Sequence, residues 1–242
     1  TLKVILSNII KNPNEDKFKT IKLSNPNVHE RIGKISIALK LLEELGYDIE
    51  PMINKDRKLL VELDDEIQIV FVKAIDVVNL VNAGVVDLGI VGSDTIFENP
   101  SEKYSQLTDF ETGKCFFALC GFPKYNDIPD GVTRRIATKY PNIARTYFEK
   151  KGQDIEIVKL QGSVELGPII GLSDAIVDIV ETGDTLKANG LSIIEPIGAV
   201  STRLIGNNER VQEKEDEIKS FVEKIQEYKR QLLYTSAGKS NR

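Results

Sequence analysis

The stretch SDAIVDIVETGDTLKANG, residues 173–190, decides how the chain folds. Residues 175–180 are apolar except for Asp178, and a short run of this kind is typical of a buried strand. The polar residues ETGDT follow directly, and TLKANG can then open a helix. A buried strand that leads through a glycine-containing loop into a helix predicts an α/β protein, in which ligands bind beyond the carboxyl ends of strands.

Outside this stretch, strand patterns alternate with helix patterns. KLLVEL and IQIVFVKA predict a hairpin, IDVVNLVNAG predicts a helix that ends at Gly84, and VVDLGIVG predicts a buried strand over 85–92. Further strands are predicted in KCFFALCGF, RRIATKY and IEIVKLQGS, and a further helix in IARTYFEKKG. This order indicates α/β architecture with a mostly parallel sheet.

Both ends of the chain have helical patterns. Residues 1–50 are expected to be helical, and a second amphipathic helix there ends at Gly46. The first apolar residues with helical spacing are Leu2, Ile5, Leu6, Ile9 and Ile10. After Asn208 the chain is highly charged but keeps an apolar stripe, which predicts an amphipathic C-terminal helix. Residues 234–242 are expected to form a frayed tail.

Composition limits the classes of protein that this chain can represent. Its 242 residues suit one large or two modest domains, and its 41% hydrophobic and 29% charged content is ordinary for a soluble protein. A net charge of −5 argues against a nucleic-acid partner, and no apolar run is long enough for a membrane helix. One histidine and two cysteines five residues apart exclude a His-rich metal site, so free thiols in a cytoplasmic protein are expected.

The loop after the predicted strand has the groups that bind a phosphate monoester. Thr182 and Thr185 supply hydroxyls, and Gly183 lets successive backbone amides converge on one anion. The acids of the stretch would repel a bare phosphate, so they fit ribose hydroxyls or Mg²⁺ better; they are Asp178, Glu181 and Asp184. The structural alternative is an ordinary strand-to-helix turn in which Thr182 is the N-cap.

Three motifs give these observations a family. The loop resembles the phosphoribosyl-diphosphate loop of phosphoribosyltransferases, and ATKYPN, GSVELGP and ETGDTL stand in the order found in the ATP phosphoribosyltransferase family. The resemblance covers about residues 47–233. It implies an α/β, bilobal core like type II periplasmic binding proteins, with lobe I at 47–92 plus 191–233 and lobe II at 93–190. The chain is similar to the short form of the family.

The resemblance also implies the reaction and its requirements. N1 of ATP attacks C1 of phosphoribosyl diphosphate and diphosphate leaves, with Mg²⁺ as cofactor, as the first step of histidine biosynthesis. A displacement of this kind at an anomeric carbon needs alignment and charge stabilisation rather than a covalent nucleophile. The short form implies a regulatory subunit similar to histidyl-tRNA synthetase and a homo- or hetero-oligomer.

Site residues follow from the matched motifs. In ETGDTL, the residues expected to bind the 5′-phosphate are Thr182, Gly183, Asp184, Thr185 and Leu186. Asp178 and Glu181 are expected near the ribose or Mg²⁺. The other residues expected to bind substrate are Arg57, Asp94, Thr138, Lys139, Tyr140, Gly162, Ser163 and Glu165. Simpler roles stay open: Arg57 and Lys139 as solvated cations, Glu165 as a charge at a helix N-terminus, and Tyr140 as core packing.

The N-terminal segment departs from the family pattern. The family begins with a strand that leads into a Pro-Lys-Gly-Arg turn, and this turn is absent; RIGKI, residues 31–35, comes nearest. Instead, NPNEDKFKTIKLSNP resembles part of a PUB domain, a helical module that binds the tail of a AAA+ ATPase. Residues 1–46 are therefore expected to be a PUB-like segment in a chimera, and the first lobe is expected to lack its first strand.

Two other functions stay open beside the enzyme. A catalytically inactive chimera would use the transferase-like part as a scaffold and the PUB-like part as an interaction module. A periplasmic-type solute receptor would share the bilobal architecture, but ETGDTL and the lack of a signal pattern argue against it.

Overall fold

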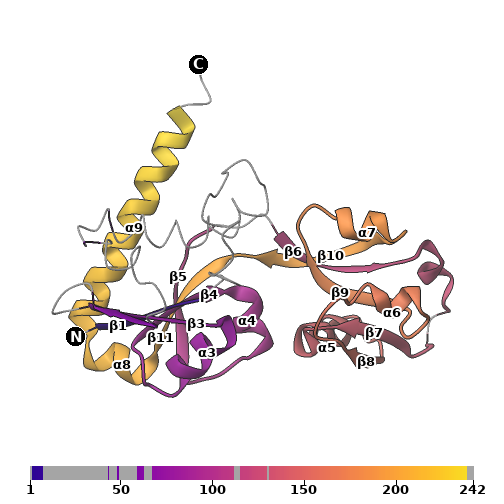
Figure 1. Ribbon diagram of the computed structural model, residues 1–242, viewed down its shortest axis with the longest axis horizontal. Coiled ribbons are helices and arrows are strands. Elements are labelled where there is room, and N and C mark those ends of the chain that lie inside the picture. Colours follow the sequence, from indigo (N-terminus) through magenta and orange to yellow (C-terminus); the bar gives the residue numbers. More distant parts are fainter. Residues whose placement is uncertain are drawn as a thin grey trace, which may run out of the picture. The chain divides into compact units, whose positions relative to one another are not determined.

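The computed structural model describes residues 2–7, 43, 48, 59–62, 67–111, 115–129 and 131–238. The chain divides into two compact units (Figure 1). The first consists of Thr1–Gly92, Ser101–Thr112 and Thr202–Arg242, and the second of Ser93–Pro100 and Gly113–Ser201. These bounds correct the expected lobes at two places, because residues 101–112 belong to the first unit and residues 191–201 to the second.

The first unit is built on a six-stranded sheet with the order β2-β3-β1-β4-β11-β5. Its strands are β1 (Leu2–Ser7), β2 (Leu60–Glu62), β3 (Ile67–Val72), β4 (Leu88–Gly92), β5 (Tyr104–Asp109) and β11 (Thr202–Asn207). β2 pairs antiparallel with β3, which confirms the predicted hairpin, and β4 lies within the strand predicted over 85–92.

Strand β1 corrects the expectation for the N-terminus. Residues 2–7 form a strand, not a helix, and this strand lies between β3 and β4 and is parallel to both. Six residues are too few for periodicity to separate strand from helix. The hypothesis that the first sheet has lost its first strand is therefore wrong.

The described part of the first unit also contains the helices α3 (Ala74–Asn82), α8 (Asn208–Glu213) and α9 (Glu215–Gly238). The turn that ends α3 needs Gly84, whose φ is +67°, as the sequence predicts. Ile218, Phe221 and Ile225 of α9 are buried in the same core as Leu88 and Leu204, which confirms the amphipathic C-terminal helix. Helix α9 runs to Gly238, so the expected tail over 234–242 begins at least five residues too early.

The second unit is built on a five-stranded sheet with the order β10-β6-β9-β7-β8. Its strands are β6 (Cys115–Gly121), β7 (Arg134–Thr138), β8 (Ile155–Lys159), β9 (Ala175–Val180) and β10 (Ser192–Val200). Its helices are α4 (Ser93–Glu98), η2 (Pro123–Asp127), α5 (Pro141–Lys150), α6 (Leu166–Ile169) and α7 (Asp184–Ala188).

Both sheets are mixed, which corrects the expectation of a mostly parallel sheet. β7, β8 and β9 are parallel, but β6 pairs antiparallel with both β9 and β10. The chain passes from β5 to β6 and later returns from β10 to β11, which accounts for the antiparallel pairs β6–β10 and β5–β11. Antiparallel partners need no crossover helix.

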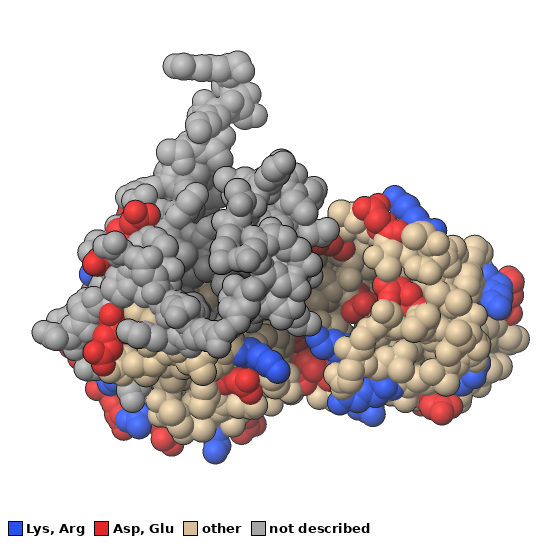
Figure 2. Space-filling view, viewed as in Figure 1, with Lys and Arg blue, Asp and Glu red and all other residues tan. Residues whose placement is uncertain are grey.

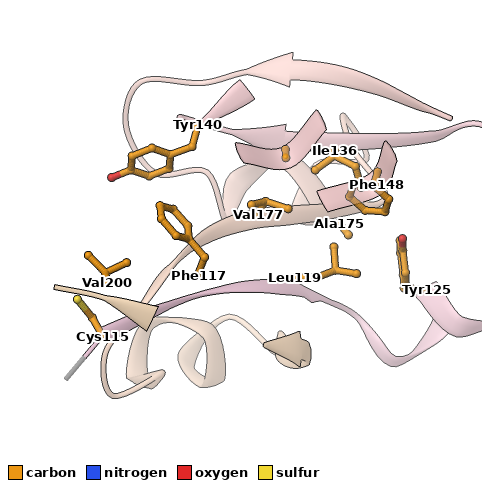
Figure 3. Packing of buried hydrophobic residues seen from close by; sticks show 11 residues of the cluster. Cys115, Phe117, Leu119, Tyr125, Ile136, Tyr140, Phe148, Ala175, Val177 and Val200 are labelled. Carbon is orange, nitrogen blue, oxygen red and sulfur yellow. The ribbon is translucent and has the colours of Figure 1, made fainter. Parts of the chain in front are cut away.

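The two faces of the second sheet bury different clusters. Ile136, Ala175 and Val177 pack on one face with Phe117 and Phe148 (Figure 3). Ala118, Cys120, Ile176, Val180 and Leu186 pack on the other face. Residues alternate between faces along a strand, so Asp178 lies on the same face as Ile176 and Val180.

Helix length and surface charge bear on whether the described part of the chain could contact a membrane or a strongly charged partner. None of the helices in the described part of the chain is long and apolar enough to cross a membrane. On the face seen in Figure 2, basic and acidic side chains are interspersed over the described surface.

Candidate active site

The predicted site residues of the second unit lie at one edge of its sheet. β7 pairs in parallel with both β8 and β9, and Thr138 is opposite Val177 on one side and Lys159 on the other. The carboxyl ends of the three strands therefore meet at the same edge. The turns that leave this edge contain residues 139–140, 160–165 and 181–183. The predicted motifs ATKYPN, GSVELGP and ETGDTL are thus brought together by the fold.

The loop after β9 turns at Gly183, where the backbone conformation favours glycine. Gly183 has φ +75° and ψ 11°, a left-handed conformation that side chains with a Cβ rarely adopt. Gly183 is at the N-cap position of α7, and the Thr182 hydroxyl oxygen accepts a hydrogen bond from the amide of Asp184, the first helical residue. Leu186 is buried and anchors the loop from below.

Polar side chains of this loop face solvent and bond to each other. The Thr182 hydroxyl donates to the Asp184 carboxylate over 2.8 Å, and the Asp184 amide donates back to the Thr182 oxygen over 3.3 Å. Thr182, Asp184 and Thr185 are exposed. Their hydroxyls and amides are thus accessible to a ligand, and Asp184 is the present acceptor for the Thr182 hydroxyl.

Asp178 is a half-buried acid of the site. Burial, together with the charge of Glu165, raises its pKa to about 6, against the opposing effects of the Ile179 amide and the charge of Lys139. Glu165 and Lys139 therefore lie close enough to influence the pKa of Asp178. A carboxyl group with this pKa can change its protonation state near neutral pH.

Cys120 lies near the same acids and is excluded as a nucleophile. It is fully buried, and burial together with Asp178 and Glu165 raises the pKa of its thiol to about 12. The thiolate, not the thiol, is the reactive form. Both cysteines are buried thiols that form no disulfide, as the sequence predicts.

Thr138 is not available to a ligand. It is fully buried, its hydroxyl donates to the Val177 carbonyl over 2.7 Å, and its oxygen accepts from the Tyr140 amide over 2.8 Å. Its role is to tie the turn after β7 to β9.

Tyr140 takes the core-packing role. Its ring packs edge-on against Phe117 with centroids 4.9 Å apart (Figure 3), and its hydroxyl donates to Asp94 over 3.4 Å. Burial raises the pKa of Tyr140 above its ordinary value, so the phenol stays protonated. Lys139 is the exposed residue of the motif, with its ammonium group 5.6 Å from the Tyr140 ring.

The remaining predicted residues differ in accessibility. Gly162 and Ser163 are exposed, and a Cβ at Gly162 would meet nothing within 4 Å. Glu165 precedes α6 directly, but its side chain makes no capping hydrogen bond there. Asp94 is in the first turn of α4. Arg57 lies outside the described residues.

Sequence reasoning missed Glu98. This last residue of α4 accepts hydrogen bonds from the backbone amides of Asn142 and Ile143, at the start of α5. One signal was present: Tyr140-Pro141 offers α5 no capping side chain of its own, so a cap from elsewhere is required.

Comparison with known proteins gives these features a family. The family model of HisG, ATP phosphoribosyltransferase, matches residues 73–227. The ATP phosphoribosyltransferase of Lactococcus lactis subsp. cremoris is 47% identical over 186 residues, which are 77% of this chain and 89% of that protein. The chain belongs to the ATP phosphoribosyltransferase family. It is therefore an enzyme of the phosphoribosyltransferase class.

Other members of the ATP phosphoribosyltransferase family agree with this assignment. The protein of Clostridium kluyveri is 49% identical over 190 residues, which are 78% of this chain and 86% of that protein. A solved structure, the ATP phosphoribosyl transferase (HisG:HisZ) complex from Thermotoga maritima, matches at a TM-score of 0.71 and 31% identity. That match covers 96% of this chain and 100% of the solved chain, and it confirms the bilobal α/β fold.

The N-terminal part of the chain also matches a second family. The PUB domain model matches residues 1–79, so it overlaps the HisG match over residues 73–79. Strand β1 lies inside the PUB match but pairs in the sheet of the first unit.

Metal binding by the protein alone is not favoured at the edge formed by β7–β9. Within the described ranges, no three His, Cys, Asp or Glu side chains are grouped so as to hold a metal ion. Mg²⁺ commonly uses only one or two carboxylates, and substrate phosphates and water complete its shell. Asp178 and Glu181 fit this second arrangement in number and chemistry.

A polar cavity of about 310 Å³ lies elsewhere in the second unit. It is lined by residues 131–134, which lead into β7, and residues 151–154, which lead into β8. This is the amino-terminal edge of those strands, opposite the edge that carries the predicted motifs. We therefore assign it no part in phosphoribosyl transfer.

Proposed function

We propose that the chain transfers the phosphoribosyl group of phosphoribosyl diphosphate to N1 of ATP and releases diphosphate, the first step of histidine biosynthesis. The observation that carries this proposal is the ETGDT loop at the end of β9, beside the half-buried Asp178, in a member of this family. ATP and phosphoribosyl diphosphate are the two substrates.

The 5′-phosphate binds to the loop from Thr182 to Leu186. The exposed hydroxyls of Thr182 and Thr185 and the backbone amides around Gly183 are the donors. A phosphate oxygen replaces the Asp184 carboxylate as the acceptor for the Thr182 hydroxyl. Gly183 contributes its backbone conformation, and Leu186 holds the loop on the core. The accessible hydroxyls and amides thus bind the phosphate, and the buried Leu186 anchors the loop.

Asp178 and Glu181 act on the sugar side of the loop. Ribose hydroxyls can donate to both carboxylates, and Mg²⁺ carried by diphosphate could use the same oxygens. When bound, Mg²⁺ would neutralise charge on the leaving diphosphate. The roles of the two acids toward ribose do not depend on that ion.

Turns after β7 and β8 complete this side of the site. Lys139 is exposed near Asp178 and supplies a cation for a substrate phosphate. Gly162, Ser163 and Glu165 line the open part of the site, and Gly162 lets a ligand approach the backbone. Thr138, Tyr140 and Asp94 position this wall through their mutual hydrogen bonds. Arg57 of the first unit remains our candidate for a further phosphate contact.

Catalysis then consists of alignment and charge stabilisation. Displacement at an anomeric carbon passes through an oxocarbenium-like state, which nearby carboxylates stabilise. No covalent intermediate is required, in agreement with the protonated, buried thiol of Cys120. The contribution of the protein is to hold N1 in line with C1.

Binding of phosphoribosyl diphosphate, measured by calorimetry with Mg²⁺, tests the loop assignment. We expect saturable binding by the wild-type chain and loss of binding in the Thr182→Ala/Thr185→Ala variant. Thr146→Ala, which changes an exposed threonine on α5, should bind normally. Equal binding by the double variant and the wild type would remove the loop from the site.

A regulatory subunit is the proposed partner. The solved HisG:HisZ complex supports assembly with a HisZ-like chain, which we expect to resemble histidyl-tRNA synthetase. Co-purification and light scattering of the two chains test this assembly. Co-elution as a hetero-oligomer would support it, and independent elution would exclude it.

The PUB match supports a second, subordinate function. Residues 1–46 would act as an interaction module for the C-terminal tail of a AAA+ ATPase, in a chain that joins PUB-like and transferase-like sequences. Titration with such a tail peptide tests the module, and absence of saturable binding would reject it. An inactive scaffold is the corresponding alternative for the whole chain, because the Pro-Lys-Gly-Arg turn is absent from the sequence.

A further inference from the structure

The start of helix α5 has no cap within its own sequence. Tyr140 is at the N-cap position, where it makes no side-chain capping hydrogen bond, and Pro141 follows at the first helical position. Proline has no backbone N–H, so the amides that lack an acceptor within the helix are those of the next two residues, Asn142 and Ile143. An N-cap side chain normally accepts from these second and third amides of a helix.

Glu98 supplies this cap from another helix. Its carboxylate oxygens accept from the Asn142 amide over 3.1 and 3.0 Å, and one of them accepts from the Ile143 amide over 3.1 Å. The Asn142 side chain donates in return to the Glu98 carbonyl over 2.9 Å. A carboxylate at the N-terminus of a helix is favoured by both charge-assisted hydrogen bonds and the helix dipole.

The same short helix holds the turn at a second point. Asp94 is four residues before Glu98 on α4, so both carboxylates lie on one face of it. Asp94 accepts from the Tyr140 hydroxyl, while the Thr138 hydroxyl oxygen accepts from the Tyr140 amide. The turn from β7 to α5 is thus fixed by α4 on one side and by β7 on the other. Lys139, whose side chain is exposed and whose ammonium group lies over the Tyr140 ring, is carried by this turn.

We propose that Glu98 is a positioning residue for phosphoribosyl transfer, because it caps α5 from α4 and so fixes the turn that presents Lys139 to the substrates. This rests on the proposed function of the β9 edge. Glu98 contacts no substrate; it acts through the backbone of α5. Its loss would leave the turn folded but less precisely placed.

A double-mutant cycle with Lys139 tests the proposal. Glu98→Gln keeps the size of the side chain but removes its charge and one acceptor, and we expect kcat/KM to fall about tenfold, the size of effect that loss of a good cap gives. In a Lys139→Ala background, Glu98→Gln should lower kcat/KM by less than about twofold, because Glu98 acts through Lys139. Glu149→Gln, an exposed glutamate on the same helix, is the matched control and should change neither value.

Two outcomes would overturn the proposal. One is an equal loss of kcat/KM from Glu98→Gln with and without Lys139, which a purely structural role predicts. The other is no loss in either background.

Hydrogen exchange separates this proposal from the proposed function. Glu98→Gln should reduce protection of the Asn142 and Ile143 amides, while Glu149→Gln should not. If the wild-type chain shows no turnover of its substrates, the proposed function fails. The hydrogen-exchange comparison of the two variants still decides whether Glu98 caps α5. Unchanged protection in Glu98→Gln would reject the cap itself.

Discussion

Two turns leave the same edge of the second sheet, and they are built in opposite ways. The turn after β7, residues 138–143, is buried at Thr138 and Tyr140 and is held by hydrogen bonds to two other elements, β9 and α4. The loop after β9, residues 181–186, exposes Thr182, Asp184 and Thr185, and Thr182 and Asp184 bond to each other. The first turn is fixed by buried side chains, whereas the second exposes its hydrogen-bonding groups. Changes at the buried Thr138 and Tyr140 should therefore mainly lower stability, and changes in the loop after β9 should mainly lower activity.

Gly183→Val should have the largest effect on activity. A β-branched residue is strained at φ +75°, so the loop must shift and its amides lose their alignment. We expect kcat/KM to fall at least about 100-fold, which corresponds to about 2.7 kcal/mol. Gly152→Val is the matched control, since Gly152 has φ +65° in open space. Chemical denaturation should show a similar loss of stability, about 1–2 kcal/mol, for both variants. Comparable losses of kcat/KM in Gly183→Val and Gly152→Val would show that the loop after β9 has no special role in activity.

Thr138→Val should have the largest effect on stability. The change removes the hydrogen bond to the Val177 carbonyl and leaves the Tyr140 amide buried without its acceptor. Loss of partners for buried polar groups costs about 2–3 kcal/mol in the free energy of unfolding. Urea denaturation measures this, with Thr146→Val on the surface of α5 as the control. A cost below about 0.5 kcal/mol would show that the turn is not fixed as described.

Asp178→Asn should raise stability while it lowers activity. Burial raises the pKa of Asp178 to about 6 from 3.8, so as pH rises the unfolded chain releases this proton before the folded chain does. The free energy of unfolding therefore decreases between about pH 4 and 6, and it stays lower above pH 6. Asparagine removes this dependence, so at pH 8 without Mg²⁺ the variant should be more stable by about 1–3 kcal/mol.

Urea denaturation at pH 4.5 and pH 8 checks the Asp178 prediction. The two proteins should differ little at the lower pH and most at the higher one. Asp154→Asn, at an exposed position, should show no such difference. A less stable Asp178→Asn variant at pH 8 would mean that partners in the site offset the cost of burying the charge.

Tyr140→Phe should have the smallest effect. The lost hydrogen bond to Asp94 is long, at 3.4 Å, and the ring keeps its packing against Phe117. We expect a loss of about 0.5–1 kcal/mol in stability and kcat/KM within about threefold of wild type. A loss of affinity for ATP by more than about tenfold would return Tyr140 to the substrate-binding residues.

Local pattern was enough to predict much of this molecule. The strand at 175–180, the conformation of Gly183 and helix α3 follow from short runs of residues, because burial and backbone conformation there depend on near neighbours. Val77, Val78 and Val81, for example, are buried on one face of α3 as their spacing predicts. The ETGDTL loop was predictable for the same reason.

Contacts between distant residues were not predictable in this way. The Thr138 hydroxyl meets its acceptor 39 residues along the chain, and the Glu98 carboxylate meets Asn142 over a separation of 44 residues. Nothing in ATKYPN indicates which of its polar groups will form hydrogen bonds within the protein and so be unavailable to a ligand. Strand β1 was misread because the strands that it pairs with, β3 and β4, are far away in sequence, and six residues are too few for periodicity to separate strand from helix.

Diphosphate release tests the central claim most directly. The wild-type chain, ATP, phosphoribosyl diphosphate and Mg²⁺ should release diphosphate only when both substrates are present, with and without a HisZ-like subunit, and Thr182→Ala/Thr185→Ala should abolish the release. Absence of diphosphate in both conditions, from a folded chain that co-purifies with its partner, would contradict the account.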